Sequence, residues 1–314
     1  MRKRRECGAL AAALLIALAA AGCVDPAWDL EGLERRHPAL RSVAGHRLTD
    51  VTPYLLPAAG TLTLFLCRWP DAARVAVSFP PDATPEERRA LEAALAAWQG
   101  AGLGLRFEAS AGPAAQIEIR FEEGLLSYGA NTVAHCAVDP VALAEPARAP
   151  AIPARLVFAS IHLGHGDPRL AGTALHELGH ALGYQGHPKR GESVMLRSTE
   201  RQRLTGQRVL AGEPFSDAGL RGLYAVPSGT VLRRLPLATG QSAVVDRLAR
   251  LAAQRGLTGP VVEVGERAGR IGWSDAGWPT VALRLLNLRQ ALQDPSKLSI
   301  EANPAASRML AGAR

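Results

Sequence analysis

The chain has 314 residues and a formal net charge of +7; 47% of its residues are hydrophobic and only 5% are aromatic. This length is enough for one substantial globular domain with a smaller appendage. Residues 1–22 hold four basic residues and one acidic residue, so the rest of the chain carries only +4. Such a mild charge gives no argument for a nucleic-acid partner, and we expect none.

Residues 1–22 have the pattern of an export signal. A basic start, from Arg2 to Arg5, precedes an apolar run that is too short to cross a bilayer as a mature helix. The run ends in Ala-Ala-Gly before Cys23, which resembles the lipobox of bacterial lipoproteins, where the cysteine is lipidated. The resemblance implies an exported protein in the bacterial cell envelope, held to the outer membrane or cell surface through Cys23. The alternative is a plain secretory signal that leaves Cys23 as an ordinary thiol.

Residues 23–67 have scattered charge and no clear periodicity, which is typical of a tether or pro-region. Two cysteines, Cys67 and Cys136, remain once Cys7 is removed with the leader and Cys23 is assigned to lipid. In an exported protein an even pair most often forms a disulfide, so we expect one between them.

The patterning of residues 68–228 predicts an α+β domain. Thr84, Pro85 and Glu87 form a capping box with proline at the first helical position, which predicts a helix to about Gln99. A second long helix is expected after Gly172, with Thr173 as its cap, and a short one after Asp217. We therefore expect a twisted mixed sheet of about five strands with two long helices; the predicted strands are residues 74–79, 103–109, 116–121, 132–138 and 156–161.

The second long helix carries a group of metal-binding side chains. His176 and His180 are four residues apart, so their rings project from the same face of a helix and can hold one tetrahedral zinc. Glu177 is placed to take a proton from a water at the open position of the metal. Gly183 allows the helix to end in a left-handed residue and reverse, which would bring His187 back as a third ligand.

Three motifs together resemble the metzincin family of zinc endopeptidases, and among them the matrixins. They are residues 176–183 (HELGHALG), a Met-turn at residues 193–196 that contains Met195, and residues 217–224, which are similar to the closing helix of matrixin domains. The resemblance covers about residues 68–228. It implies a metzincin-like catalytic domain with a zinc cleft and one catalytic Zn²⁺.

In that family the zinc would be held by His176, His180 and His187, with Glu177 as the general base and Met195 packed beneath the ligands. The resemblance thus implies a zinc-dependent endopeptidase whose protein or peptide substrate lies extended along an edge strand. Calcium is bound by some members of the family, but no acidic loop of this sequence supports a calcium site. His135 matches one ligand of a second, structural zinc whose other ligands are not matched.

Several alternatives stay open at the level of sequence. Three residues separate Gly183 from His187 where the family has two, so Glu200 or Glu213 is an alternative third ligand. Cys67 could instead act as a thiolate that blocks the zinc in a latent form.

A different function is also open, because the chain could be a zinc-bound but catalytically inactive binding module or a structural envelope lipoprotein. Residues 229–314 form a smaller C-terminal region of unknown role. Within it, residues 242–254 and 279–293 are amphipathic and are expected to be packing faces.

Overall fold

The computed structural model describes most of the chain from Tyr54 to Gly312. The predicted signal peptide, Cys23 and the first part of the predicted tether lie outside the described residues. Within the described part, no helix combines the length and apolar character needed to span a membrane. The described residues are 54–312 without 111–114, 124, 126–128, 140–150, 189–191, 239, 265–267 and 276–278.

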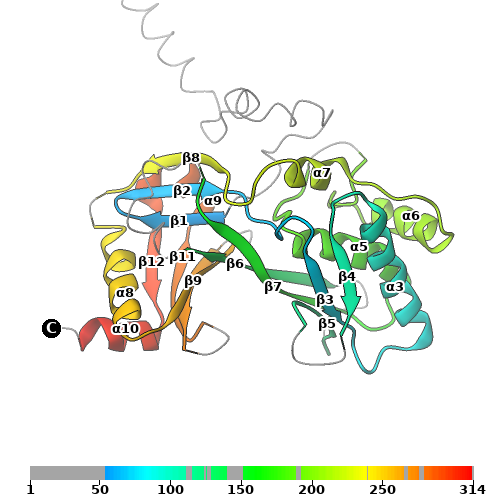
Figure 1. Cartoon of the computed structure of the whole chain (residues 1–314), viewed down its shortest axis with the longest axis horizontal. Helices are drawn as coiled ribbons and strands as arrows, with labels where there is room; N and C mark the ends of the chain where they lie inside the picture. The colour runs from blue at the N-terminus through cyan, green and yellow to red at the C-terminus, as the bar shows by residue number, and fades with distance from the viewer. Residues whose placement is uncertain are drawn as a thin grey trace, which may run out of the picture.

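A nine-stranded mixed sheet runs through both halves of the molecule (Figure 1), in the order β12-β11-β10-β9-β6-β7-β5-β3-β4. Strands β4, β3, β5 and β7 are parallel, whereas β6 is antiparallel to β7 and to β9. The strands are β3 (Arg74–Ser78), β4 (Arg106–Ala109), β5 (Ile117–Phe121), β6 (Ala130–Val138), β7 (Ala154–Leu163), β9 (Thr258–Val264), β10 (Ala268–Ser274), β11 (Val281–Leu286) and β12 (Ser299–Ala302).

The five strands expected from the sequence, β3 to β7, are therefore only part of this sheet. The C-terminal region continues the sheet, because β9 pairs with the end of β6 and β10, β11 and β12 follow by antiparallel pairing. The sheet has more strands than the five that were expected, because no strands were predicted in residues 229–314.

A second, three-stranded sheet joins the start of the described chain to the beginning of the C-terminal region. It consists of β1 (Tyr54–Ala58), β2 (Thr61–Phe65) and β8 (Val231–Pro236), all antiparallel. The β1–β2 turn has left-handed backbone at Ala59 and Gly60, with φ of 47° and 73°, as a tight hairpin requires. From Tyr54 onwards, the segment expected to be a tether thus forms two buried strands.

The helices of the described residues form two groups, one in each half of the molecule (Figure 1). The capping box of α3 is confirmed, since Thr84 Oγ1 accepts from the Glu87 amide at 3.2 Å and Glu87 Oε2 from the Thr84 amide at 2.9 Å. The helices are α3 (Pro85–Gly100), α5 (Leu170–Ala181), α6 (Thr199–Leu210), α7 (Ala218–Tyr224), α8 (Ala243–Gln254), α9 (Leu288–Gln293) and α10 (Pro304–Ala311), with a 3-10 turn at Pro295–Lys297.

Two expectations about helices were wrong. Helix α5 begins at Leu170 rather than after Gly172, and Thr173 does not cap it: its hydroxyl donates to Asp167 Oδ2 at 2.7 Å. Residues 279–293 do not form one amphipathic element, because they divide into β11 and α9 at Asn287, whose φ is 60°. The apolar residues of the strand happen to continue at helical spacing into the helix, which hides the boundary.

Helices α5 and α6 cross in direct backbone contact. A Cβ added to Gly172 would lie less than 3.0 Å from the carbonyl oxygen of Gln202, and one added to Gly206 would lie as close to the amide of Gly172. Only glycine fits at either position. Helix α6, which the sequence analysis did not predict, therefore packs directly on the helix that carries the histidines.

Candidate metal centre

Three imidazole rings converge at the end of helix α5. His176 Nε2 lies 3.1 Å from His187 Nε2 and 3.2 Å from His180 Nε2. One ligand atom from each of the three residues lies within 4.8 Å of the others, and no other such group of three occurs among the described residues. The structure thus brings together the three histidines that the sequence predicted as ligands.

Backbone carbonyls fix the orientation of two of these rings. The Nδ1 of His176 donates to the Val194 carbonyl at 2.8 Å, and the Nδ1 of His180 donates to the Tyr184 carbonyl at 2.6 Å. A carbonyl oxygen can only accept, so the proton sits on Nδ1 and the lone pair of each Nε2 points into the cluster. This is the arrangement by which a protein prepares a histidine to bind a metal through Nε2.

The third ring has a different partner. Arg197 Nε donates to His187 Nδ1 at 3.2 Å, and the guanidinium is exposed. Because Nδ1 accepts in this contact, the proton of a neutral His187 would sit on Nε2. Metal binding through that nitrogen therefore requires Arg197 to move away from Nδ1, which opposes metal binding.

The three rings are neutral at physiological pH. Burial lowers the pKa of His176 and of His180 to about 4, and burial together with the two neighbouring rings and Arg197 lowers that of His187 to about 3. Three neutral imidazoles whose Nε2 atoms lie close together fit Zn²⁺, which accepts three protein ligands and keeps a fourth position open.

Glu177 lies beside the histidines on α5 and contacts strand β6. The hydroxyl of Thr132 donates to Glu177 Oε2 at 2.6 Å and also lies 3.2 Å from the Glu177 carbonyl oxygen. Burial raises the pKa of the Glu177 carboxyl, while His176 and the Thr132 hydroxyl oppose this rise. A raised pKa makes the carboxylate a stronger base.

The turn that contains Met195 lies directly against α5. Met195 is fully buried, and a Cβ added to Gly179 would lie less than 3.0 Å from its Sδ. The turn is closed by Ser193, whose Oγ accepts from the Met195 amide at 3.0 Å and donates to Asp217 Oδ2 at 2.6 Å. Asp217 also caps α7, so this helix holds the turn under the histidines.

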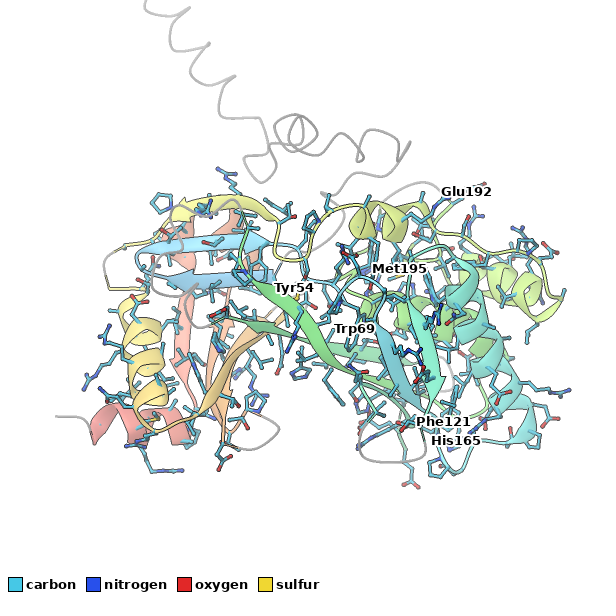
Figure 2. All side chains as sticks on the ribbon, viewed as in Figure 1. Tyr54, Trp69, Phe121, His165, Glu192 and Met195 are labelled. Atoms are coloured by element: carbon cyan, nitrogen blue, oxygen red, sulfur yellow. A yellow bond between two sulfur atoms is a disulfide. The ribbon has the colours of Figure 1, made fainter. Side chains whose placement is uncertain are left out.

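Aromatic side chains satisfy the carbonyl groups that helix α5 leaves free at its end. Trp69 Nε1 donates to the Ala181 carbonyl at 3.0 Å, and the Tyr224 hydroxyl donates to the Leu182 carbonyl at 2.9 Å. The chain then reverses at Gly183, with φ of 109°; a side chain there would collide with the carbonyl of Cys67. Figure 2 shows Trp69 and Met195 in the half of the molecule that contains α5.

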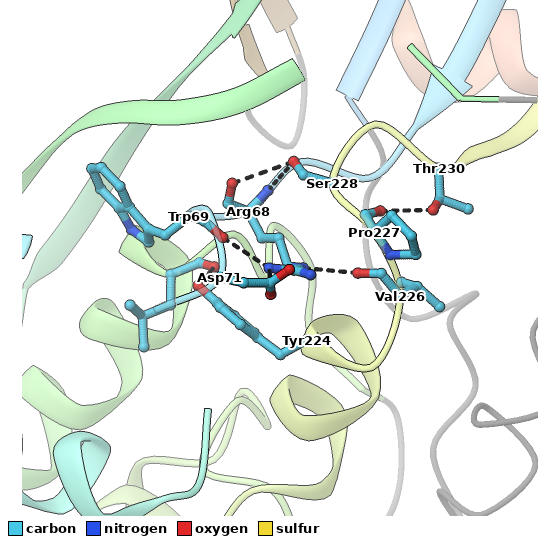
Figure 3. A network of polar contacts seen from close by, with 9 residues as sticks. Arg68, Trp69, Asp71, Tyr224, Val226, Pro227, Ser228 and Thr230 are labelled. Carbon is cyan, nitrogen blue, oxygen red and sulfur yellow. Dashed lines mark hydrogen bonds and ion pairs between the residues drawn. The ribbon is translucent and has the colours of Figure 1, made fainter. Parts of the chain in front are cut away.

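A buried arginine holds these aromatic groups in place (Figure 3). The guanidinium of Arg68 lies 5.1 Å from the centre of the Tyr224 ring. It donates to the carbonyls of Trp69 at 2.9 Å and Val226 at 2.8 Å, and pairs with Asp71 at 2.7 Å. The segment around residue 68 therefore acts as a support for helix α5, which carries His176 and His180.

Cys67 and Cys136 form a disulfide, with Cα atoms 6.2 Å apart. The bond joins the supporting segment to strand β6, which carries Thr132. It also rules out Cys67 as a free thiolate that blocks a metal in this structure. Both of its ends lie in the core.

The alternative third ligands lie apart from the cluster. Glu200 pairs with Arg203 at 2.7 Å and Glu213 with Arg208 at 2.6 Å, all on or beside α6. His135 is buried, and its Nδ1 lies 3.3 Å from Glu263 Oε1. A second metal group around His135 does not occur among the described residues.

Sequence reasoning missed several residues that shape the site: Thr132, Trp69, Arg68 and Arg197. Thr132 is an ordinary strand residue, and only the crossing of β6 over α5 gives it a role. The tryptophan and arginine act across more than a hundred residues of sequence, so no local pattern reveals them. Arg197 follows the predicted Met-turn, and no pattern in the sequence assigns it a role.

Comparisons with known proteins give partial likenesses. No protein-family model matches the chain, and no curated protein matches it. Two structures of myroilysin are each 23% identical to this chain, each with a TM-score of 0.24. The first match covers 40% of this chain and 55% of the myroilysin chain, and the second covers 39% of this chain and 49% of the myroilysin chain. High choriolytic enzyme 1, a hatching enzyme zinc-protease from the medaka fish Oryzias latipes, is 19% identical over 38% of this chain and 50% of its own, also with a TM-score of 0.24. The chain thus spans about half the length of each of these solved structures.

Proposed function

We propose that this protein is a zinc-dependent peptidase of metzincin type. The proposal rests on the convergence of the Nε2 atoms of three neutral histidines. Glu177, the residue after His176, is buried, and its carboxylate accepts a hydrogen bond from the Thr132 hydroxyl. A site that serves only to bind zinc for structure has four protein ligands and no use for such a carboxylate.

Zinc bound by the three histidines would polarise a peptide carbonyl and lower the pKa of water towards 7. The chain supplies the proton transfer. Glu177 takes a proton from the attacking water and returns it to the amine that leaves. The Thr132 hydroxyl holds the Glu177 carboxylate in place through one oxygen and leaves the other free for this task. Met195 and the carbonyls of Val194 and Tyr184 keep the ligands oriented.

The test compares the purified full chain with Glu177→Gln and, as a matched control, with Glu301→Gln, a change at an exposed residue of strand β12. We expect about one zinc per chain in all three proteins. Hydrolysis of an unfolded protein such as casein should fall about 10²–10⁴-fold in Glu177→Gln and stay unchanged in Glu301→Gln. Equal hydrolysis by the parent and Glu177→Gln would refute the proposed role of the carboxylate.

We also propose that the chain is exported and anchored to the cell envelope through a lipid on Cys23. The basic and apolar leader supports this, and so does the disulfide, because such bonds persist in oxidising compartments. Mass spectrometry of the mature amino terminus provides the test. An acylated Cys23 is the expected result, whereas an unmodified terminus would contradict anchoring.

A further inference from the structure

Strand β6 is an open edge of the sheet for only part of its length. Along its whole length it pairs with β7 on one side. On the other side, the described residues place β9 against Cys136 and Ala137 alone. Within the described part of the chain, residues 130–134 therefore present an unpaired edge, and Asn131 is exposed there while Thr132 and Val133 are partly exposed. An edge of this kind can accept an added strand.

This open edge lies at the candidate metal centre. Thr132 is on it, and its hydroxyl contacts the Glu177 carboxylate at 2.6 Å. The bond that is cleaved would therefore lie close to Thr132. A peptide that adds to β6 would pair through residues on either side of this point.

Strand β9 occupies the continuation of the same edge. It runs antiparallel to β6, with Val262 opposite Cys136 and Val261 opposite Ala137. The contact between β9 and β6 extends one residue further along β6, to His135, because Glu263 Oε1 lies 3.3 Å from His135 Nδ1. In Figure 1, β6 leads from the half that contains α5 to the half that contains β9. The disulfide at Cys136 fixes β6 at this boundary.

The direction of the substrate decides which of its ends meets β9. Antiparallel pairing is the more stable arrangement, and β9 already adopts it on this edge. A substrate paired in the same way runs in the same direction as β9, so its residues upstream of the cleaved bond point towards β9. Only Val133 and Ala134 lie between Thr132 and the blocked residue His135. This leaves space for roughly two or three upstream residues in extended conformation.

We propose, on the basis of the proposed peptidase function, that the C-terminal region limits the substrate to polypeptide ends. Strand β9 takes the place of the upstream part of a bound substrate, so the enzyme cleaves within about three residues of a free amino terminus. Residues downstream of the cleaved bond run past Ala130 and meet no strand of the described chain.

The test uses peptides with one common cleavable core. One series carries N-terminal extensions of one to ten residues, and the matched control series carries C-terminal extensions of the same composition. Cleavage positions and kcat/KM are measured by mass spectrometry. Binding of the same peptides to zinc-loaded Glu177→Gln is measured by fluorescence anisotropy, so a second readout does not depend on turnover.

We expect kcat/KM and affinity to fall about tenfold or more once more than about three residues precede the cleaved bond. C-terminal extensions should have little effect. Equal tolerance of both kinds of extension would overturn the inference while leaving the peptidase function intact, and so would a penalty on C-terminal extensions only. A protein that cleaves no peptide and no unfolded protein would refute the proposed function itself, and this inference with it.

Discussion

Replacement of Gly172 by alanine tests how helix α5 is held against α6. The added Cβ would lie less than 3.0 Å from the backbone carbonyl of Gln202, and backbone cannot rotate away as a side chain can. Overpacking of this kind costs about 1–3 kcal/mol, or more where the structure cannot relax. Alanine is better than glycine in a helix by about 1 kcal/mol, which offsets part of this cost. Because the contact is with backbone and very close, the overpacking cost is at the upper end of this range, and we expect Gly172→Ala to lower the free energy of unfolding by about 2 kcal/mol net.

Gly100, at the end of α3, provides the matched control. A Cβ there meets nothing within 4 Å, so Gly100→Ala should be neutral or stabilise the protein by about 0.5 kcal/mol. Urea unfolding of both variants, monitored by circular dichroism in the presence of a chelator, measures the difference. If Gly172→Ala proved as stable as Gly100→Ala, the direct crossing of α5 and α6 would be wrong.

The remaining predictions concern the supports of the site. Tyr224→Phe removes the donor to the end of α5 and should cost about 1–3 kcal/mol in urea unfolding; no loss would show that this hydroxyl does not cap the helix. Replacing both Cys67 and Cys136 by serine opens a loop with a sequence separation of 69 and should cost about 4 kcal/mol, seen as a lower Tm that reductant no longer changes. Arg197→Met should raise zinc affinity about threefold to tenfold in a competition titration, because the guanidinium donates to His187 Nδ1 and so keeps the proton on Nε2, the nitrogen that would bind the metal; weaker binding would contradict this. The unfolded chain binds more protons than the folded one between pH about 6.5 and about 4, because the two buried ligand histidines of α5 have a pKa of about 4. The free energy of unfolding of the metal-free protein should thus fall as the pH is lowered through this window, and a flat profile in chelator would contradict it.

The candidate site was predictable because its chemistry lies within one short stretch of sequence. The spacing of His176 and His180 on a helix, and the reversal at Gly183, are local properties of the chain. The capping box of α3 was predictable for the same reason. In each case the residues that make the contact are within a few positions of one another.

The C-terminal half of the sheet could not be predicted in the same way. Strand β9 pairs with β6 across more than a hundred residues, and nothing local to Val261 or Val262 names that partner. Residues 61–67 alternate weakly, as in a strand, but β1 and its pairing with β2 were missed, because the hairpin is completed by β8, which is distant in the sequence. Helix α6 has few buried apolar residues, since its contact with α5 uses glycine rather than a hydrophobic stripe.

We propose that three histidines, His187 among them, hold one zinc, and a zinc affinity titration tests this proposal. The purified full chain is compared with His187→Ala and with His162→Ala, a histidine on β7 that lies outside the cluster. We predict one zinc per chain in the parent and in His162→Ala, with affinity lowered at least about 10–100-fold in His187→Ala. Zinc binding by His187→Ala that equals that of the parent would contradict the three-histidine centre.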